Sequence, residues 1–213
     1  MKELIVLAVA LGALAVAGSA PAASTLTISD GVTTFTLTSP TGVVNYQNSS
    51  FDSAWSVVIV TGETKPALGS VCHPSMDLSI QAISLTSLPP HNLIITFSDN
   101  SFGPSPPSFQ ATLSGNVTSG TGQTITYNTY YDAANATGAT NTLLTASGNL
   151  APPNYSASNT SGAINQCLYS LTQVVTIGGA GAAAGSSYSL DASLTSAASP
   201  PVFTSVLAGG SLG

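Results

Sequence analysis

The sequence predicts an all-β protein: an antiparallel β-sandwich of about ten strands that forms one domain. Three observations support this prediction. Apolar and polar residues alternate in nearly every block of the chain after residue 24, turn sequences rich in Gly and Pro separate these blocks, and no stretch has the 3.6-residue period of an amphipathic helix. Alternation with a period of two places one row of side chains in a core and the next in solvent, as in an antiparallel sheet.

The strands can be placed from this alternation. In TTFTLT, residues 33–38, Phe35 and Leu37 face one way, and the other face carries Thr34, Thr36 and Thr38. The segment WSVVIV, residues 55–60, is apolar on both sides, which predicts a central strand covered on both faces. The other alternating blocks are residues 76–82, 93–97, 109–114, 125–131, 169–177 and 188–194.

Two further segments connect these blocks. Residues 178–185, GGAGAAAG, lie between the last two alternating blocks, so we expect those blocks to form a closing hairpin that seals the core. Residues 147–165 are rich in Ser, Asn, Gly and Pro, which predicts a long loop.

The two ends of the chain have a different composition from the strands. Lys2 precedes an apolar run over residues 4–17, and Ala20-Pro21-Ala22 supplies a small-residue cleavage pattern, as in a secretory signal peptide. We therefore expect a signal peptide at residues 1–22, the sandwich at residues 23–194, and a polar tail containing Pro and Gly at residues 195–213. The protein is expected to be secreted, without a stable membrane anchor.

Charge excludes one class of partner. The whole chain contains two Lys or Arg residues against eight Asp or Glu, a formal net charge of -6, and after the signal peptide Lys65 is the only strong cation. Nucleic acid is excluded, because a protein binds phosphate backbones by neutralising several phosphates at once. Anionic membrane surfaces are disfavoured for the same reason.

The cysteines and histidines indicate structure rather than chemistry. Cys72 and Cys167 are the only cysteines, and an even number in an exported chain predicts one disulfide bond. His73 lacks the further ligands that a metal site needs, and His91 follows two prolines in a predicted turn. We expect no cofactor and no bound metal, although Ca²⁺ between loops stays open.

The carboxylates raise the possibility of a secreted hydrolase. Glycoside hydrolysis uses two carboxylates across a cleft, so Asp77, Asp99 or Asp132 would have to converge in the fold. Asp99 and Asp132 also stand in turn-like sequences, where hydrogen bonds to the nearby backbone explain them with fewer assumptions. We therefore expect no catalytic residues, and the protein is not expected to be an enzyme.

The aromatic residues offer a route to carbohydrate binding. Trp55, Tyr127, Tyr130 and Tyr131 could form a platform on which sugar rings stack. The alternative is ordinary core packing for Trp55 and alternation of the tyrosines between the two faces of a sheet. Both interpretations stay open at the level of sequence.

Several segments resemble a known group of exported proteins. These are TGETKPALGSVCHPSMDLSI, HNLIITFSDNSFGP, SGNVTSGTGQTITYNTYYDAANA and CLYSLTQVVTIGGAGAAAGSSYSLDASL, in this order. Residues 25–194 are similar to the body of bacterial PEP-CTERM proteins, which are sorted by exosortases. The resemblance implies a β-rich protein of the bacterial envelope or extracellular matrix, linked to exopolysaccharide. The group's C-terminal sorting motif is absent, because residues 199–213 contain no Arg or Lys.

These observations together predict a secreted structural or interaction protein associated with the envelope or an exopolysaccharide matrix. Its expected partners are extracellular polysaccharide or other matrix proteins, and open edge strands with few charges favour homo-assembly. A carbohydrate-binding surface module is the first alternative. A secreted hydrolase that uses Asp carboxylates is the second.

Overall fold

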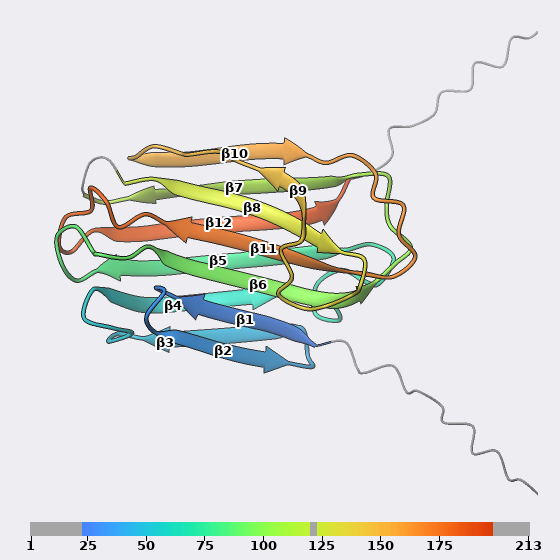
Figure 1. Ribbon diagram of the computed structural model, residues 1–213, viewed down its shortest axis with the longest axis horizontal. Coiled ribbons are helices and arrows are strands. Elements are labelled where there is room, and N and C mark those ends of the chain that lie inside the picture. The colour runs from blue at the N-terminus through green and yellow to red at the C-terminus, as the bar shows by residue number, and fades with distance from the viewer. Residues whose placement is uncertain (1–22, 120–122, 198–213) are drawn as a thin grey trace, which may run out of the picture.

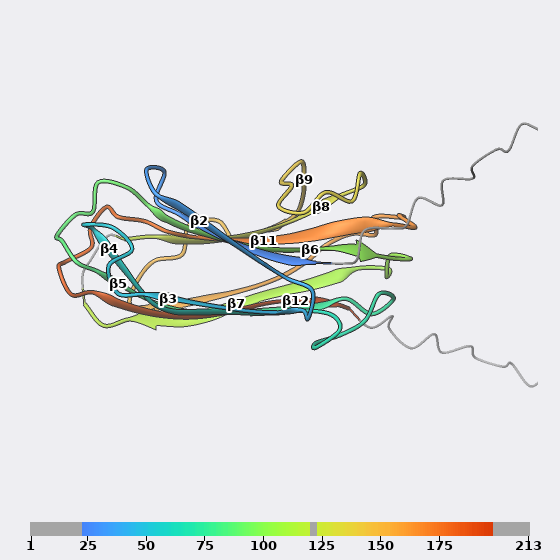
Figure 2. The same ribbon diagram turned by 90° about the horizontal axis from the view of Figure 1, so that it is seen from below.

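The computed structural model describes residues 23–119 and 123–197, which form two antiparallel six-stranded sheets packed face to face (Figures 1 and 2). The prediction of a β-sandwich is confirmed, with twelve strands rather than about ten. None of the described residues belongs to a helix that is long and apolar enough to cross a membrane. The predicted signal peptide, and the predicted tail from residue 198 onward, lie outside the described residues.

Sheet A has the strand order β2-β1-β6-β11-β8-β9. Its strands, in chain order, are β1 (Ser24–Ser29), β2 (Thr34–Ser39), β6 (Leu93–Phe102), β8 (Ile125–Asp132), β9 (Thr142–Ala146) and β11 (Tyr169–Ile177). Sheet B has the order β10-β7-β12-β5-β4-β3. Its strands are β3 (Val43–Asn48), β4 (Trp55–Glu63), β5 (Ser75–Ser84), β7 (Phe109–Val117), β10 (Asn154–Thr160) and β12 (Ser187–Ser196).

The expected closing hairpin is not present. Strand β11 lies in the middle of sheet A, between β6 and β8, whereas β12 lies in the middle of sheet B, between β5 and β7. Residues 178–186 therefore cross from one sheet to the other (Figure 1). Each of the two strands pairs with two neighbours. Both still contribute side chains to the core, β11 from sheet A and β12 from sheet B. Strand β12 ends at Ser196, two residues beyond the predicted end of the domain.

One other local prediction is wrong, and another is correct only in part. Residues 154–160, inside the predicted long loop, form edge strand β10, whose Tyr155 points into the core. Strand β4 is an interior strand, between β5 and edge strand β3, but only its inner face is fully covered. Its apolar outer side arises from a β-bulge between Val57 and Ile59, which leaves Val58 40% exposed at the surface.

The core lies between the two sheets and is filled from both inner faces. Its largest fully buried side chains are aromatic: Trp55, Tyr127, Tyr155, Tyr169, Tyr188, Phe97, Phe102 and Phe109. One side of the sandwich, where β2 and β3 form the edges, is closed by Phe35 of sheet A and Tyr46 of sheet B. Their rings stack with centroids 4.1 Å apart. This packing leaves the outer faces of both sheets as the broad surfaces of the molecule.

Candidate functional site

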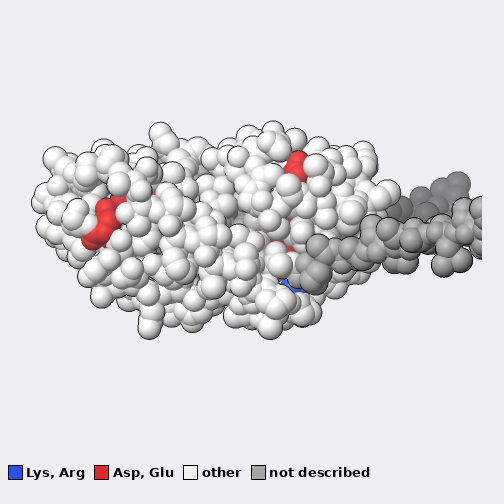
Figure 3. Space-filling view, turned by 60° about the horizontal axis from the view of Figure 1, so that its bottom comes forward, with Lys and Arg blue, Asp and Glu red and all other residues white. Residues whose placement is uncertain are grey.

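The outer face of sheet B is polar and carries three carboxylates. Glu63 of β4 is directly opposite Asp77 of β5, and Asp191 lies on the neighbouring strand β12. Most of the other outward positions on these strands and on β7 are Ser, Thr, Asn or Gln. Burial and the charges of Asp191 and Glu63 raise the pKa of Asp77. Figure 3 shows another side of the molecule, on which acidic and basic residues cover only small areas.

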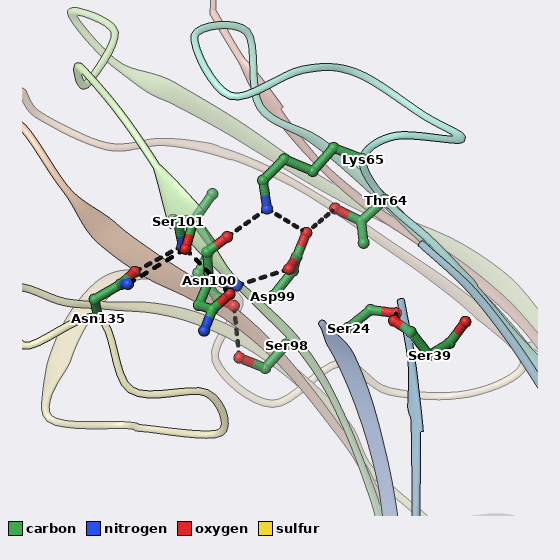
Figure 4. Close-up of polar contacts among 10 residues, drawn as sticks. Ser24, Ser39, Thr64, Lys65, Ser98, Asp99, Asn100, Ser101 and Asn135 are labelled. Carbon is green, nitrogen blue, oxygen red and sulfur yellow. Dashed lines mark hydrogen bonds and ion pairs between the residues drawn. The ribbon is translucent and has the colours of Figure 1, made fainter. Parts of the chain in front are cut away.

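Lys65 is buried and paired with Asp99 (Figure 4). Lys65 Nζ lies 2.7 Å from Asp99 Oδ2, donates a second hydrogen bond to the carbonyl of Asn100, and stands 3.9 Å from the centroid of the Phe102 ring. Asp99 also accepts hydrogen bonds from Thr64 Oγ1 at 3.1 Å and from the backbone N–H of Asn100 at 2.8 Å. The side chains are 5% and 1% exposed, so this pair fixes the fold and offers no charge to a ligand.

The three carboxylates named for a hydrolase do not converge. Asp99 is buried in its ion pair, and Asp77 lies on the outer face of sheet B. Asp132, at the end of β8, accepts hydrogen bonds from Ala136 N at 3.0 Å and from Asn141 Nδ2 at 3.2 Å. The bond from Ala136 holds the pKa of Asp132 below its ordinary value. Asp132 therefore organises the loop between β8 and β9, as expected for a carboxylate in a turn.

A different carboxylate pair is present. Asp30, after β1, and Asp52, before β4, lie near each other, and each carboxyl shifts the pKa of the other. Each also accepts two backbone N–H groups at one oxygen: Asp30 from residues 32 and 33, and Asp52 from residues 54 and 55. Burial raises the pKa of Asp30, but the hydrogen bond from the backbone of Thr33 and the neighbouring Asp52 carboxyl outweigh it and hold the pKa low. Burial and the neighbouring Asp30 carboxyl raise the pKa of Asp52.

This pair predicts an unusual pH dependence. The raised pKa of Asp52 contributes stability that is complete below its unfolded pKa, near 3.9, and is lost as pH rises through the folded pKa. The lowered pKa of Asp30 contributes stability that is present above that value and is lost on acidification. We expect Asp52→Asn, which stays neutral, to be more stable than the unaltered protein at neutral pH, with the difference shrinking towards pH 4. Urea unfolding at several pH values measures this.

Asp30→Asn is the matched control for this prediction. It removes the carboxylate whose charged form is favoured, so we expect it to lower stability at neutral pH, opposite to Asp52→Asn. If both variants shift the unfolding midpoint in the same direction at every pH, the two carboxyls do not shift each other's pKa in this way.

The four aromatic residues do not form one platform. Trp55 is 0% exposed, and its Nε1 donates to the carbonyl of His91 at 3.1 Å. Tyr127 is 1% exposed, with its hydroxyl 2.5 Å from Gln173 Oε1. Tyr131 packs half-buried against the core, whereas Tyr130 is also half-buried but faces outward from sheet A. Trp55 and Tyr127 are therefore core residues, because neither ring reaches solvent.

Cys72 and Cys167 do not form the predicted disulfide bond; both are free thiols and both are exposed. Their segments meet at Gly103. Cys72 Sγ lies 3.5 Å from the Gly103 carbonyl, and a Cβ on Gly103 would stand 1.9 Å from the Cys167 carbonyl oxygen. The Cys72 thiol is thus directed at a backbone carbonyl rather than at a second sulfur. Only glycine fits at residue 103, where φ is +146°.

One open hollow lies on the outer face of sheet B, near edge strand β3. It has a volume of about 570 Å³ and is lined by Gln47, Asn48, Ser49, Ser56, Val58 and Ile83. Its walls offer amides, hydroxyls and two aliphatic side chains but no charge. The bulges in β3 and β4 at this point create the hollow. Sequence periodicity did not indicate it, because a bulge interrupts the alternation on which the strand predictions depend.

Within residues 23–119 and 123–197, the structure places no larger group of reactive residues together. His73 and His91 are both exposed, and no group of three or more His, Cys, Asp or Glu among the described residues is placed to hold a metal ion. Comparisons of the chain with protein-family models, with curated proteins and with solved structures found no match.

Proposed function

We propose that this chain is a secreted, non-catalytic structural or interaction protein that associates with an extracellular polysaccharide matrix. The observation that carries the proposal is the chemistry of the two outer sheet faces. They display mainly Ser, Thr, Asn and Gln on regularly spaced strands, with three carboxylates on sheet B and no Lys or Arg on the strands of either sheet.

Polysaccharides match this surface better than charged polymers do. Hydroxyl and amide side chains both donate and accept hydrogen bonds, as sugar hydroxyls do. An anionic polymer would meet the carboxylates of sheet B without any exposed strong cation among the described residues to offset them, because Lys65 is buried. The resemblance of residues 25–194 to exosortase-sorted proteins supports a place in an exopolysaccharide matrix.

Four carboxylates already interact with other groups of the protein, which favours a role without catalysis. Asp99 is neutralised by Lys65, and Asp132 caps a loop. Asp30 and Asp52 each accept two backbone N–H groups of their own turn. Each of these groups therefore has a structural partner in place of a substrate.

Self-association is a second contribution to a matrix role. Strands β2 and β10 each end a sheet, and neither contains Lys, Asp, Glu or Pro, the residues that natural proteins use to block edge pairing. A second copy could add its own edge strand there. This would extend a sheet, and with it a polar face, from one molecule to the next.

Co-sedimentation tests the proposal. The purified protein is mixed with insoluble cellulose, a neutral polysaccharide, and with calcium alginate gel, an anionic one, and the bound fraction is measured at low and high salt. We expect binding to cellulose that changes less than about twofold with salt, because no ion pairs are formed. We expect little binding to alginate and no release of soluble sugar.

The control is the protein sedimented alone, which separates matrix binding from self-association. Reducing sugar released from either polymer would support the hydrolase alternative. Failure to bind any neutral polysaccharide would refute the matrix proposal.

A further inference from the structure

The outer face of sheet A carries a two-dimensional array of hydroxyl groups. Five neighbouring strands, β2, β1, β6, β11 and β8, are paired in an unbroken register over this face. Their outward residues form three rows that cross the strands. Row one is Thr38, Thr25, Ser98, Thr172 and Tyr130; row two is Thr36, Thr27, Thr96, Val174 and Asn128; row three is Thr34, Ser29, Ile94, Thr176 and Thr126. We call these fifteen residues the threonine face.

Threonine is concentrated here. It occupies nine of these fifteen positions, although only 26 of the 213 residues in the chain are Thr. The outer face of sheet B, built from the same kind of strand, uses mainly serine and amide residues together with three carboxylates. Strand propensity alone does not explain this difference, because both faces lie on strands of the same fold.

The array is open over rows two and three. Row one is covered at its centre, where the loop between β8 and β9 lies over Ser98 and Thr172, and Gly138 N donates to Ser98 Oγ at 2.8 Å. Figure 2 shows this loop and the β1–β2 turn rising from the same side of the sandwich, towards opposite ends of the strands. Row two lies between the β8–β9 loop and the β1–β2 turn.

Regular spacing suits an extended ligand. Neighbouring strands lie about 4.7 to 4.9 Å apart, so a row across five strands spans about 19 Å. Within the rows, Thr27 and Thr36 hydroxyls lie 3.2 Å apart, and Ser29 and Thr34 hydroxyls 2.8 Å apart. Each hydroxyl has one hydrogen to donate and two lone pairs, so paired hydroxyls keep capacity for an outside partner.

The charge of the face selects the ligand class. Its only ionisable side chain is the phenol of Tyr130, so the face matches a neutral polymer. Threonine methyl groups, with Ile94 and Val174 near the centre, offer apolar contacts beside the hydroxyls. A sugar ring has the same combination of C–H surface and hydroxyl groups. The face therefore complements a neutral glycan.

We propose that the threonine face binds a neutral linear polysaccharide, with the chain lying along rows two and three across the strands. This inference rests on the proposed matrix function and specifies the surface that performs it. The polysaccharide hydroxyls hydrogen-bond to the threonine hydroxyls, and its C–H surfaces contact the methyl groups. The hollow beside β3 on sheet B is not the site.

The test compares two matched triple variants in the full chain. Thr27→Val, Thr36→Val and Thr96→Val remove three hydroxyls from row two, and valine keeps the shape and the strand preference of threonine. Thr61→Val, Thr112→Val and Thr195→Val make the same change on the outer face of sheet B. The two triple variants are closely matched, because Thr112 Oγ1 contacts Ser193 Oγ at 2.8 Å, much as the hydroxyls of Thr27 and Thr36 contact each other. Circular dichroism and urea unfolding check that both variants fold.

Cellulose is the probe, and binding is measured by co-sedimentation. Each lost hydrogen bond weakens binding modestly, so we expect the sheet A variant to bind at least about tenfold more weakly and the sheet B variant to bind within twofold of the unaltered protein. Equal loss in both variants, or loss in the sheet B variant alone, overturns the inference while the matrix function stands. If the unaltered protein does not bind cellulose or any other neutral polysaccharide, both proposals fail.

Discussion

Replacing Lys65 with Met is expected to lower the free energy of unfolding by about 3 to 5 kcal/mol, because it leaves the Asp99 carboxylate buried without its counter-charge. Asp99 would keep the hydrogen bonds from Thr64 and from the backbone of Asn100, but neither carries a positive charge. No second Lys or Arg stands among the described residues to take over the role. Urea unfolding followed by circular dichroism measures the loss.

The double variant Lys65→Met with Asp99→Asn separates a lost charge from lost packing. A neutral amide at residue 99 can still accept from Thr64 and Asn100, so we expect the double variant to be more stable than Lys65→Met alone. Asp191→Asn, at an exposed position on sheet B, is the control and should change stability by no more than about 0.5 kcal/mol. A cost below about 1 kcal/mol for Lys65→Met would mean that water reaches the pair.

The fold class could be predicted because each strand carries its own alternation. Phe35 and Leu37, or Met76 and Leu78, alternate with polar residues whatever the partner strand is, so a local pattern was sufficient. Pairing could not be predicted in this way. Strands β11 and β12 are consecutive and amphipathic, as a hairpin would be, yet each completes a different sheet. Which neighbour a strand chooses depends on contacts between segments far apart in the chain.

The same limit applies to the sites. Lys65 could be recognised in the sequence as a lone cation, but its partner Asp99 is 34 residues away on β6 of sheet A, whereas Lys65 follows β4 of sheet B. Part of the threonine face is recognisable in the sequence as TLT at residues 25–27 and TFTLT at residues 34–38. Its extent depends on register, which brings Thr96 and Thr176 into line with them. The burial of Trp55 agrees with one of the two interpretations of this residue, core packing, which its apolar neighbours in the sequence allowed.

Truncating Trp55 to Ala is expected to cost about 3 to 5 kcal/mol of stability, because it removes the largest fully buried side chain in the core. The indole lies against the Tyr188 ring, with centroids 6.0 Å apart, and its N–H group donates to the His91 carbonyl. Trp55→Phe keeps an aromatic ring and loses only this hydrogen bond and part of the volume, so a smaller loss is expected. Urea unfolding of both variants gives the comparison.

Trp55→Phe also distinguishes a core residue from a sugar-stacking residue. If Trp55 serves only the core, the folded Phe variant should bind cellulose within about twofold of the unaltered protein, because the ring has no contact with solvent. If Trp55 were a stacking residue, the same substitution would weaken cellulose binding much more, since the indole would face the sugar directly. As the chain contains a single Trp, its fluorescence reports this position alone. Its emission should not shift when a soluble neutral glucan is added, and a shift together with weakened binding by Trp55→Phe would return Trp55 to the binding surface.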